Sequence, residues 1–148
     1  MTQADEYKRG RELALGMLTR REQSQKELSF KLSKKDIPDD IAMQLISDLI
    51  ENDWQSDDRF ASMLSRTRSN RGFGPNRITM ELRQHDINWD GQLENPVDWT
   101  ENALERLNKH YKIAPQTQRE RQKCRSYLNQ RGFTSEQIRN ALDEFCSR

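Results

Sequence analysis

Apolar residues recur three and four positions apart along most of this chain, the spacing that places side chains on one face of an α-helix. Ile41, Leu45 and Leu49 follow it, as do Ile138 and Leu142. No segment alternates apolar and polar residues as a half-buried strand does. The pattern therefore predicts an all-α protein. Its expected helices cover residues 3–20, 24–35, 39–53, 57–70, 75–85, 97–112, 116–131 and 134–146.

One pattern occurs three times, each time at the end of a predicted helix. Leu32, Leu82 and Leu128 each follow an apolar residue four positions earlier and precede, four positions later, an Asp or Gly and then a large apolar residue. Aspartate and glycine tolerate the left-handed conformation that ends a helix, so the next apolar residue can fold back onto the last turn. A basic residue at the negative end of the helix dipole precedes each stop. The basic residue and the stop are Lys35-Asp36, His85-Asp86 and Arg131-Gly132.

The repeated pattern also predicts how the chain is organised. We expect three tandem three-helix repeats, with domains at residues 1–55, 56–96 and 97–148. The middle repeat is expected to have a shortened third helix, because residues 88–93 leave room for one or two turns at most. Charged residues make up 33% of the chain and hydrophobic residues 32%, which suits an elongated array of small units better than one globule.

Residues that favour helix starts stand where the predicted helices begin. Two pairs have the sequence of a capping box, in which a hydroxyl and a side chain three residues later bond reciprocally to the backbone. Other starts have a capping serine or a proline near the first helical position. The sites are Ser24 with Glu27, Thr134 with Gln137, Ser56, Gly74-Pro75 and Asn95-Pro96.

Charge is distributed unevenly along the chain, although the net charge is only +1. Residues 59–85 contain six arginines and one acid, Glu81. Residues 115–148 contain seven basic and four acidic residues, whereas the first 55 residues contain nine basic and eleven acidic ones. The protein therefore has a basic middle and a mildly basic C-terminal part, the kind of surface that meets anionic partners.

The sequence lacks the usual motifs of enzymes and metal sites. It has no G-x-x-x-x-G-K-[ST] phosphate loop, and His85 and His110 have no Cys or carboxylate at metal-ligand spacing. Cys124 and Cys146 fall among apolar helical positions and are expected to be buried free thiols. We therefore predict a protein that binds macromolecules, with no catalysis, cofactor or metal.

Location and assembly are also predicted from apolar content. No apolar run approaches the ~20 residues of a membrane span, and the polar residues 1–11 differ from a secretory signal. We expect a cytoplasmic protein without membrane contact. We also expect a monomer, because no helix carries a spare long apolar stripe.

Three segments resemble motifs of a known family. Residues 18–28 resemble L-x-x-R-E-H-S-x-x-E-L, residues 56–61 resemble L-D-D-x-R-F-A, and residues 71–82 resemble K-G-x-G-P-x-R-I-x-x-E-L. These are motifs of the RecX family, bacterial regulators of the RecA recombinase, and the resemblance covers nearly the whole chain. The third is the most specific, because its glycines follow an arginine-rich helix and open the next one.

The resemblance implies a curved, elongated molecule of three three-helix repeats and a role in recombination, DNA repair and the SOS response. It implies a negative modulator that binds the groove of the RecA filament on single-stranded DNA. Filament growth, ATP hydrolysis, strand exchange and co-protease activity would then be inhibited. The implied partners are the RecA filament and, through it, single-stranded DNA, with weak direct DNA binding left open.

The sequence departs from the family pattern at a few positions. Gln23 stands where the family usually has His, and Asp36 and Asp86 stand where Gly is common. These changes are mild, because Gln still forms hydrogen bonds and Asp tolerates the turn. The shortened middle repeat bears on the curvature of the molecule and on how many RecA subunits it spans.

Basic residues in two segments are the candidate contacts to RecA or DNA. Arginine donates parallel hydrogen bonds to phosphate or carboxylate, and the helix start after Gly74 would offer free N–H groups to an anion. The alternative is that these residues form an ordinary solvated helix face, and the spacing in the second segment spreads them over more than one face. The candidates are Arg66, Arg68, Arg71, Arg77 and Arg83, then Arg119, Arg121, Lys123 and Arg125.

Aromatic residues and one further arginine leave specific expectations. Phe73 lies between two glycines and would either stack on a base or dock in a RecA pocket, or pack beneath the glycine turn. Arg59 is expected to form a local ion pair or cap with Asp57 and Asp58. The tryptophans near helix ends are expected to pack between helices. They are Trp54, Trp89 and Trp99.

Two other functions stay open from the residues alone. One is a sequence-independent DNA-binding helical protein without a RecA partner. Such a protein should be basic overall, whereas this chain is near neutral and its first third leans acidic. The other is a helical adaptor for an unrelated protein.

Overall fold

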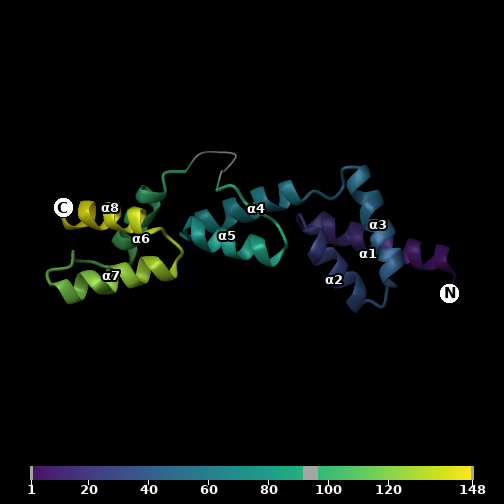
Figure 1. Ribbon diagram of the computed structural model, residues 1–148, viewed down its shortest axis with the longest axis horizontal. Helices are drawn as coiled ribbons and strands as arrows, with labels where there is room; N and C mark the ends of the chain where they lie inside the picture. Colours follow the sequence, from purple (N-terminus) through teal and green to yellow (C-terminus); the bar gives the residue numbers. More distant parts are fainter. Residues whose placement is uncertain (1, 92–96, 148) are drawn as a thin grey trace. The chain divides into compact units, whose positions relative to one another are not determined.

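Helices form all the regular secondary structure in the part of the chain that the structure describes. The computed structural model describes residues 2–91 and 97–147. The all-α prediction is confirmed, and each described helix begins and ends within two residues of its expected bounds. Figure 1 labels the helices α1 (Gln3–Arg20), α2 (Gln25–Lys34), α3 (Asp39–Glu51), α4 (Asp57–Asn70), α5 (Pro75–Gln84), α6 (Trp99–His110), α7 (Gln118–Gln130) and α8 (Ser135–Cys146).

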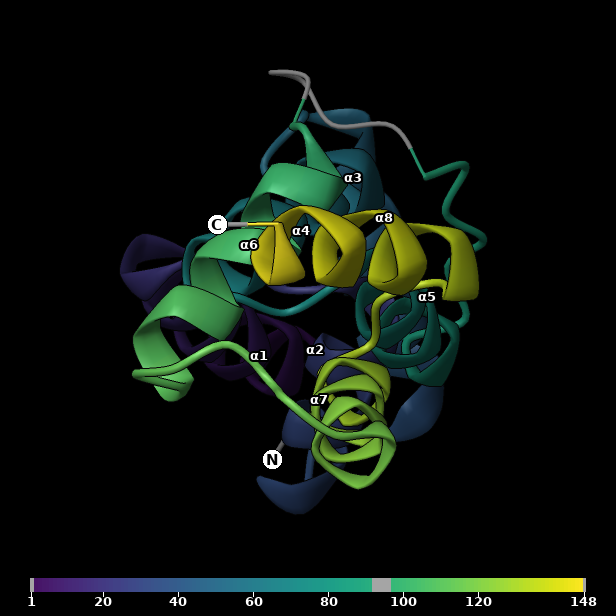
Figure 2. The same cartoon turned by 90° about the vertical axis from the view of Figure 1, so that its left-hand side faces the viewer.

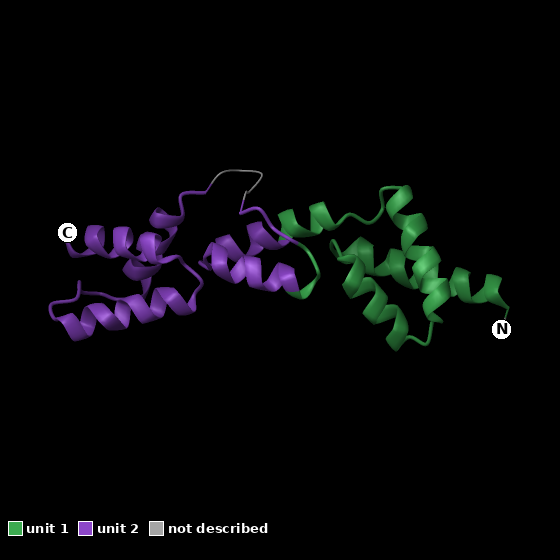
Figure 3. Cartoon of the chain, viewed as in Figure 1, with its two compact units in different colours: residues 1–63, 84–87 green, residues 64–83, 88–148 purple. Residues whose placement is uncertain are grey.

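Contacts between residues divide the chain into two compact units, coloured in Figure 3. Unit 1 comprises residues 1–63 and 84–87, and unit 2 comprises residues 64–83 and 88–148. The first part of α4 thus belongs to unit 1 and the rest to unit 2. Compact units are not repeats, so the predicted domain boundaries of residues 1–55, 56–96 and 97–148 stay a prediction.

The core of unit 1 lies between α1, α2 and α3, which all contact one another. Leu28 and Leu32 from α2 and Leu45 from α3 are fully buried there, together with Ala14 of α1. Full burial of a leucine side chain stabilises the fold by about 2 kcal/mol. These residues share helix faces at the predicted spacing, so the apolar pattern is what holds the three helices together.

Two glutamines form a buried polar link in unit 1. Gln23 is 3% exposed, donates to the Met17 carbonyl at 3.2 Å and accepts from the Lys31 ammonium at 2.9 Å. Gln55 is 1% exposed and donates to the Gln23 carbonyl at 3.1 Å and to the Asp57 carboxylate at 2.9 Å. Gln23 therefore makes hydrogen bonds at the position where the RecX pattern usually has His.

The turn after α5 belongs to unit 1, and its His85 side chain packs against α4 and the start of α2. Its Nδ1 lies 2.7 Å from the Ser24 hydroxyl, and its ring lies 4.6 Å from the Phe60 ring, measured between centroids. The sequence explained His85 only as a helix-end residue, so this packing role was missed. Arg59 forms ion pairs as expected, but its partners are Glu22 at 3.1 Å and Asp53 at 3.0 Å, not the neighbouring aspartates.

The main core of unit 2 lies between α6, α7 and α8. Leu104 and Leu107 of α6 and Leu128 of α7 are fully buried, and Phe133 is 1% exposed. Figure 2 shows these helices with α8 in yellow in the foreground. Trp99 packs against this core as predicted, whereas Trp54, in unit 1, is 53% exposed, so its predicted packing role is wrong.

The predicted left-handed stops are confirmed at all three positions. Asp36, Asp86 and Gly132 have φ angles of 62°, 60° and 95°. The N–H groups of Ile37 and Phe133 then donate to the carbonyls of the leucines five residues earlier, at 3.1 and 3.2 Å. This bonding pattern satisfies the last carbonyls of α2 and α7, which the helices leave free.

The predicted helix starts are mostly found. Thr134 and Gln137 form the full capping box. Ser24 caps α2 through its hydroxyl, but the Glu27 carboxylate bonds instead to Arg21, at 2.6 and 3.0 Å, because that guanidinium can donate twice. α6 is capped by Asp98, and Asn95-Pro96 lies outside the described residues, as do residues 92 and 93.

The two cysteines differ in burial. Both cysteines are free thiols; Cys124 is buried as expected, whereas Cys146 is only half-buried at the end of α8. Burial raises the pKa of the Cys124 thiol. None of the described helices is both long and apolar enough to cross a membrane.

Candidate interface for filament and nucleic acid

The glycine turn between α4 and α5 brings arginines of unit 2 together. Gly72 has a φ of +83°, which lets the chain reverse before α5 begins at Pro75. The following Phe73 side chain is half-buried between two guanidinium groups. Arg77 lies 4.5 Å and Arg131 4.2 Å from the centre of its ring. Of the two expectations for Phe73, packing within the turn is found in the structure, and binding to a partner stays a prediction.

Two backbone N–H groups at the start of α5 are already bonded within unit 2. Gly74 donates to the Arg131 carbonyl and Asn76 to the Gly132 carbonyl, both at 2.8 Å. The expectation that these groups are free to hold an anion is therefore wrong. They join the turn before α5 to the turn after α7 because both segments expose unpaired backbone groups at helix ends.

Glycine is required in these turns by close packing of the two segments. A Cβ atom at Gly74 would lie 2.5 Å from the carbonyl carbon and oxygen of Gly132. One at Gly132 would lie 2.5 Å from Cβ of Arg77. The Gly-x-Gly sequence thus serves contact between segments of the chain, in addition to any role toward a partner.

Arg131 is the residue that ties this contact together. Its guanidinium donates to the Gly72 carbonyl at 3.0 Å and to the Arg71 carbonyl at 2.7 Å while it covers the Phe73 ring. Burial lowers the pKa of Arg131, and the nearby charges of Arg106 and Arg77 lower it further. The sequence indicated Arg131 only as a helix-end cation.

Arg106 of α6 completes what we call the arginine cluster, defined as Arg71, Arg77, Arg106 and Arg131. The Arg106 side chain would contact a Cβ at Gly72, and its Nε is buried without a hydrogen bond among the described residues. Arg77 Nε is also buried and unbonded, 3.7 Å from Glu81. Glu81 is the acid that pairs with the cluster in the described residues, so positive charge exceeds negative charge there. No motif pointed to Arg106.

The remaining candidate arginines of α4 and α5 differ in whether an internal ion pair holds their side chains. Arg68 is held by Glu81, with Nε 2.8 Å from the carboxylate. The side chains of Arg66, Arg71 and Arg83 are exposed and, among the described residues, have no hydrogen-bond or ion-pair partner. These three can therefore turn to a partner without breaking an internal bond.

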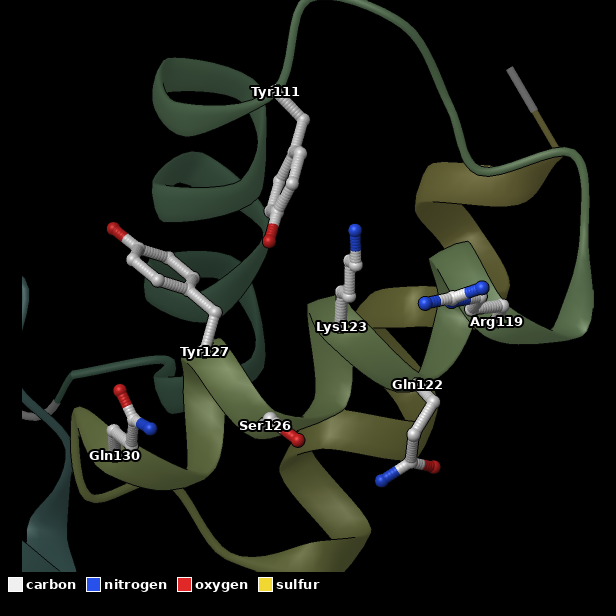
Figure 4. Close-up of a pocket in the computed structure, with 7 residues that line it drawn as sticks. All are labelled: Tyr111, Arg119, Gln122, Lys123, Ser126, Tyr127 and Gln130. Carbon is white, nitrogen blue, oxygen red and sulfur yellow. The ribbon is translucent and has the colours of Figure 1, made fainter.

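Basic and aromatic side chains also meet beside α7. A hollow of about 510 Å³ is lined by residues that include Tyr111, Tyr127, Arg119 and Lys123. Figure 4 shows these side chains as sticks. The Tyr127 ring stacks on His110 at 4.0 Å between centroids, with 13° between the planes. Arg119 and Lys123 thus line the same hollow, so both side chains could contact one partner surface. This aromatic stack has no signal in the sequence, because its residues come from different helices.

Two candidates on α7 lie away from that hollow. Arg125 is exposed and lines a different hollow with Arg139 of α8. Arg121 is half-buried. The expected spread of the α7 basic residues over more than one face is thus found, since these two residues do not line the hollow beside Tyr127.

The described residues contain no group of three or more His, Cys, Asp or Glu arranged to hold a metal ion. The chemistry of both basic regions is instead that of guanidinium and ammonium groups beside aromatic rings. Such groups bind phosphates, carboxylates and the faces of bases.

Family models and relatives agree with this architecture. Three models match the chain: the first, second and third three-helix domains of RecX, at residues 11–49, 56–90 and 97–142. The chain belongs to the RecX family. The predicted resemblance is thereby confirmed, and so is the organisation as three-helix repeats.

Curated relatives and a solved structure match RecX proteins over most of the chain. The regulatory protein RecX of Stenotrophomonas maltophilia (strain R551-3) is 38% identical over 86% of this chain and 82% of its own. That of Xanthomonas campestris pv. campestris (strain B100) is 36% identical over 94% of each. A crystal structure of RecX from Lactobacillus salivarius superimposes with a TM-score of 0.82 at 25% identity, covering 98% of this chain and 99% of that one. The chain is thus a member of a family of regulatory proteins.

Proposed function

We propose that this RecX-family chain is a negative modulator of the RecA recombinase. It binds the groove of the RecA filament on single-stranded DNA and inhibits filament growth, ATP hydrolysis, strand exchange and co-protease activity. The observation that carries the proposal is family membership through all three repeat models, with relatives named regulatory proteins that match over most of their length. Its cytoplasmic location, its monomeric state and its lack of catalysis are parts of the same proposal.

The basic regions of unit 2 supply the contacts to the filament. The arginine cluster holds more positive than negative charge, and Arg66, Arg71 and Arg83 are exposed. The hollow beside α7 adds Arg119 and Lys123. Several modest patches on one chain raise the overall affinity by linkage, so we expect multivalent binding to successive parts of the filament.

Titration of this protein into RecA that hydrolyses ATP on single-stranded DNA tests the proposal. We expect hydrolysis to fall at amounts well below the RecA concentration, because an effect on the filament spreads to many subunits. Raising the salt concentration should weaken the inhibition, since arginine contacts to phosphate or carboxylate are screened. Unchanged hydrolysis at excess protein would contradict the proposal.

A charge reversal separates this function from DNA binding without RecA. Arg71→Glu changes an exposed side chain, so the fold should persist. We expect it to weaken inhibition of RecA severalfold, because the other patches remain. If the wild type leaves RecA unaffected, binds free single-stranded DNA, and loses that binding with Arg71→Glu, the simple DNA-binding function is the correct one.

A further inference from the structure

A groove of about 1050 Å³ runs along α2 and α3 in unit 1 and is lined by large exposed apolar side chains. Phe30 is 60% exposed, Met43 72% and Ile50 40%. The ammonium of Lys34 lies 4.9 Å from the centre of the Phe30 ring. Exposed apolar side chains that share one groove mark an interaction surface more often than scattered ones do.

The third repeat contains an equivalent but smaller groove, of about 490 Å³, with different side chains. Leu32 and Leu128 are equivalent, which sets a shift of 96 positions between the first and third repeats. With this shift each of the four buried residues of α8 corresponds to a buried residue of α3, for example Ala141 to Leu45 and Phe145 to Leu49. The groove between α7 and α8 is lined by Ser126, Arg139 and Ser135, among others, which are the equivalents of Phe30, Met43 and Asp39.

This correspondence separates what folding needs from what the groove presents. The third repeat buries its core with Ser126 and Arg139 at these positions, so closing a repeat does not need Phe30 or Met43. Leaving Phe30 and Met43 exposed forgoes the stabilisation that burial of two large apolar side chains would give. We therefore expect Phe30 and Met43 to contact a partner and not to stabilise unit 1.

Charge around the groove limits what can enter it. Three carboxylates line it, on Asp39, Asp57 and Asp86, against the ammonium of Lys26 in the lining and that of Lys34 over the Phe30 ring. Asp57 already accepts hydrogen bonds from Gln25 and Gln55. Lys26 is already paired with Asp86 at 3.5 Å. Asp39 is exposed and lies at the start of α3. An apolar floor with an acidic rim suits a segment that carries an apolar side chain beside a lysine or arginine.

We propose that the groove between α2 and α3 is a protein-docking site that receives an apolar side chain and a neighbouring basic side chain of a RecA subunit. This inference rests on the proposed function and deepens it: unit 1 recognises the protein of the filament, whereas the basic regions of unit 2 meet anionic groups. Phe30 and Met43 supply the apolar contact, and Asp39 pairs with the basic side chain.

Replacing the groove residues by their third-repeat equivalents tests the proposal in the full chain. Phe30→Ser with Met43→Arg should weaken binding to RecA filaments on single-stranded DNA by 10- to 100-fold, the range of a pair of buried apolar contacts. The dependence of affinity on salt should be little changed, because no phosphate contact is lost. Asp39→Ser alone should weaken binding a fewfold. Sedimentation of filaments with labelled protein measures all three.

Ile113→Ser is the matched control, since it removes an exposed apolar side chain, 76% accessible, from unit 2. It should bind as the wild type does, and circular dichroism should show that the double variant is folded. Equal filament binding by the folded double variant and the wild type overturns the groove assignment and leaves the proposed function standing. A wild type that neither binds nor inhibits filaments overturns the proposed function itself. A wild-type dimer that the double variant abolishes would assign the groove to a second copy and overturn the RecA assignment.

Discussion

The first and third repeats bury equivalent residues but expose different ones. Leu32 and Leu128 are both fully buried, at the same place in α2 and α7. Four positions further on, one repeat turns with Asp36 and the other with Gly132. At the groove, Phe30 of the first repeat corresponds to Ser126 of the third. The repeat therefore fixes the core and the helix ends, while the exposed faces are free to take on separate binding roles.

The turns show how packing limits that freedom. Asp36 adopts a φ of 62° with a side chain in place, so its turn has room for one. Gly132 lies against the backbone and Cβ of Arg77. The same left-handed turn therefore ends a helix in the first repeat, and both ends a helix and contacts a second segment in unit 2.

Removing either equivalent leucine is the strongest way to test the shared core. Leu32→Ala and Leu128→Ala should each lower the free energy of unfolding by about 3 kcal/mol, from lost burial and the cavity left behind. Urea unfolding of the full chain, followed by circular dichroism, measures both. A cost below about 1 kcal/mol for one of them would show that its repeat is loosely packed and that the two cores are not equivalent.

An alanine in place of Gly132 tests the difference between the turns. Gly132→Ala should lower the free energy of unfolding by about 2 kcal/mol or more, because the new Cβ meets Arg77 and φ stays positive. Gly16→Ala is the matched control: a Cβ there meets nothing within 4 Å, and alanine favours a helix interior. The control should gain about 0.5–1 kcal/mol, and the urea unfolding experiment described above measures both variants. Equal effects of the two changes would contradict the packing argument.

Replacing Arg131 by lysine examines the link between the turns without removing a charge. Lysine cannot donate in a planar fork to the carbonyls of Gly72 and Arg71, nor stack as well on Phe73. Arg131→Lys should cost about 1–2 kcal/mol of unfolding free energy. The conservative change Arg119→Lys, at an exposed side chain of α7, should cost nothing measurable. If both variants unfold alike, the guanidinium of Arg131 does not hold the turns together.

Elements that depend on local sequence could be predicted, and those that depend on distant contacts could not. The helices and left-handed stops follow from apolar spacing and from single residues such as Asp36, so they were found. The arginine cluster joins Gly72 to Arg106 and Arg131, which no local pattern brings together. The bonds from Gly74 and Asn76 were missed for the same reason, since a free helix start looks the same in sequence as an occupied one.

The sequence predicted which basic residues make up the candidate site, but not which of their side chains are free to bind a partner. The sequence predicted Arg66, Arg68 and Arg83 alike as contacts to a partner. In the structure Arg68 is held by Glu81, while the other two side chains are exposed. The sequence shows Glu81 as the one acidic residue of the basic segment 59–85. Its choice of partner depends on how α4 and α5 pack, which periodicity does not determine.

Acid titration gives the smallest effect that still distinguishes the repeats. Glu27 of the first repeat corresponds to Lys123 of the third. Burial raises the pKa of the Glu27 carboxyl, but the hydrogen bonds and charge of Arg21 outweigh it, so the pKa lies below its ordinary value of 4.5. The ionised form is therefore stabilised by folding, fully above about pH 4.5, and this stability is lost as pH falls through the lowered pKa. Glu27→Gln should be less stable than the wild type by about 1 kcal/mol or less at pH 7, and the difference should shrink toward pH 3. Urea unfolding at both pH values measures it, and a difference that grows on acidification would show that Arg21 does not stabilise the carboxylate.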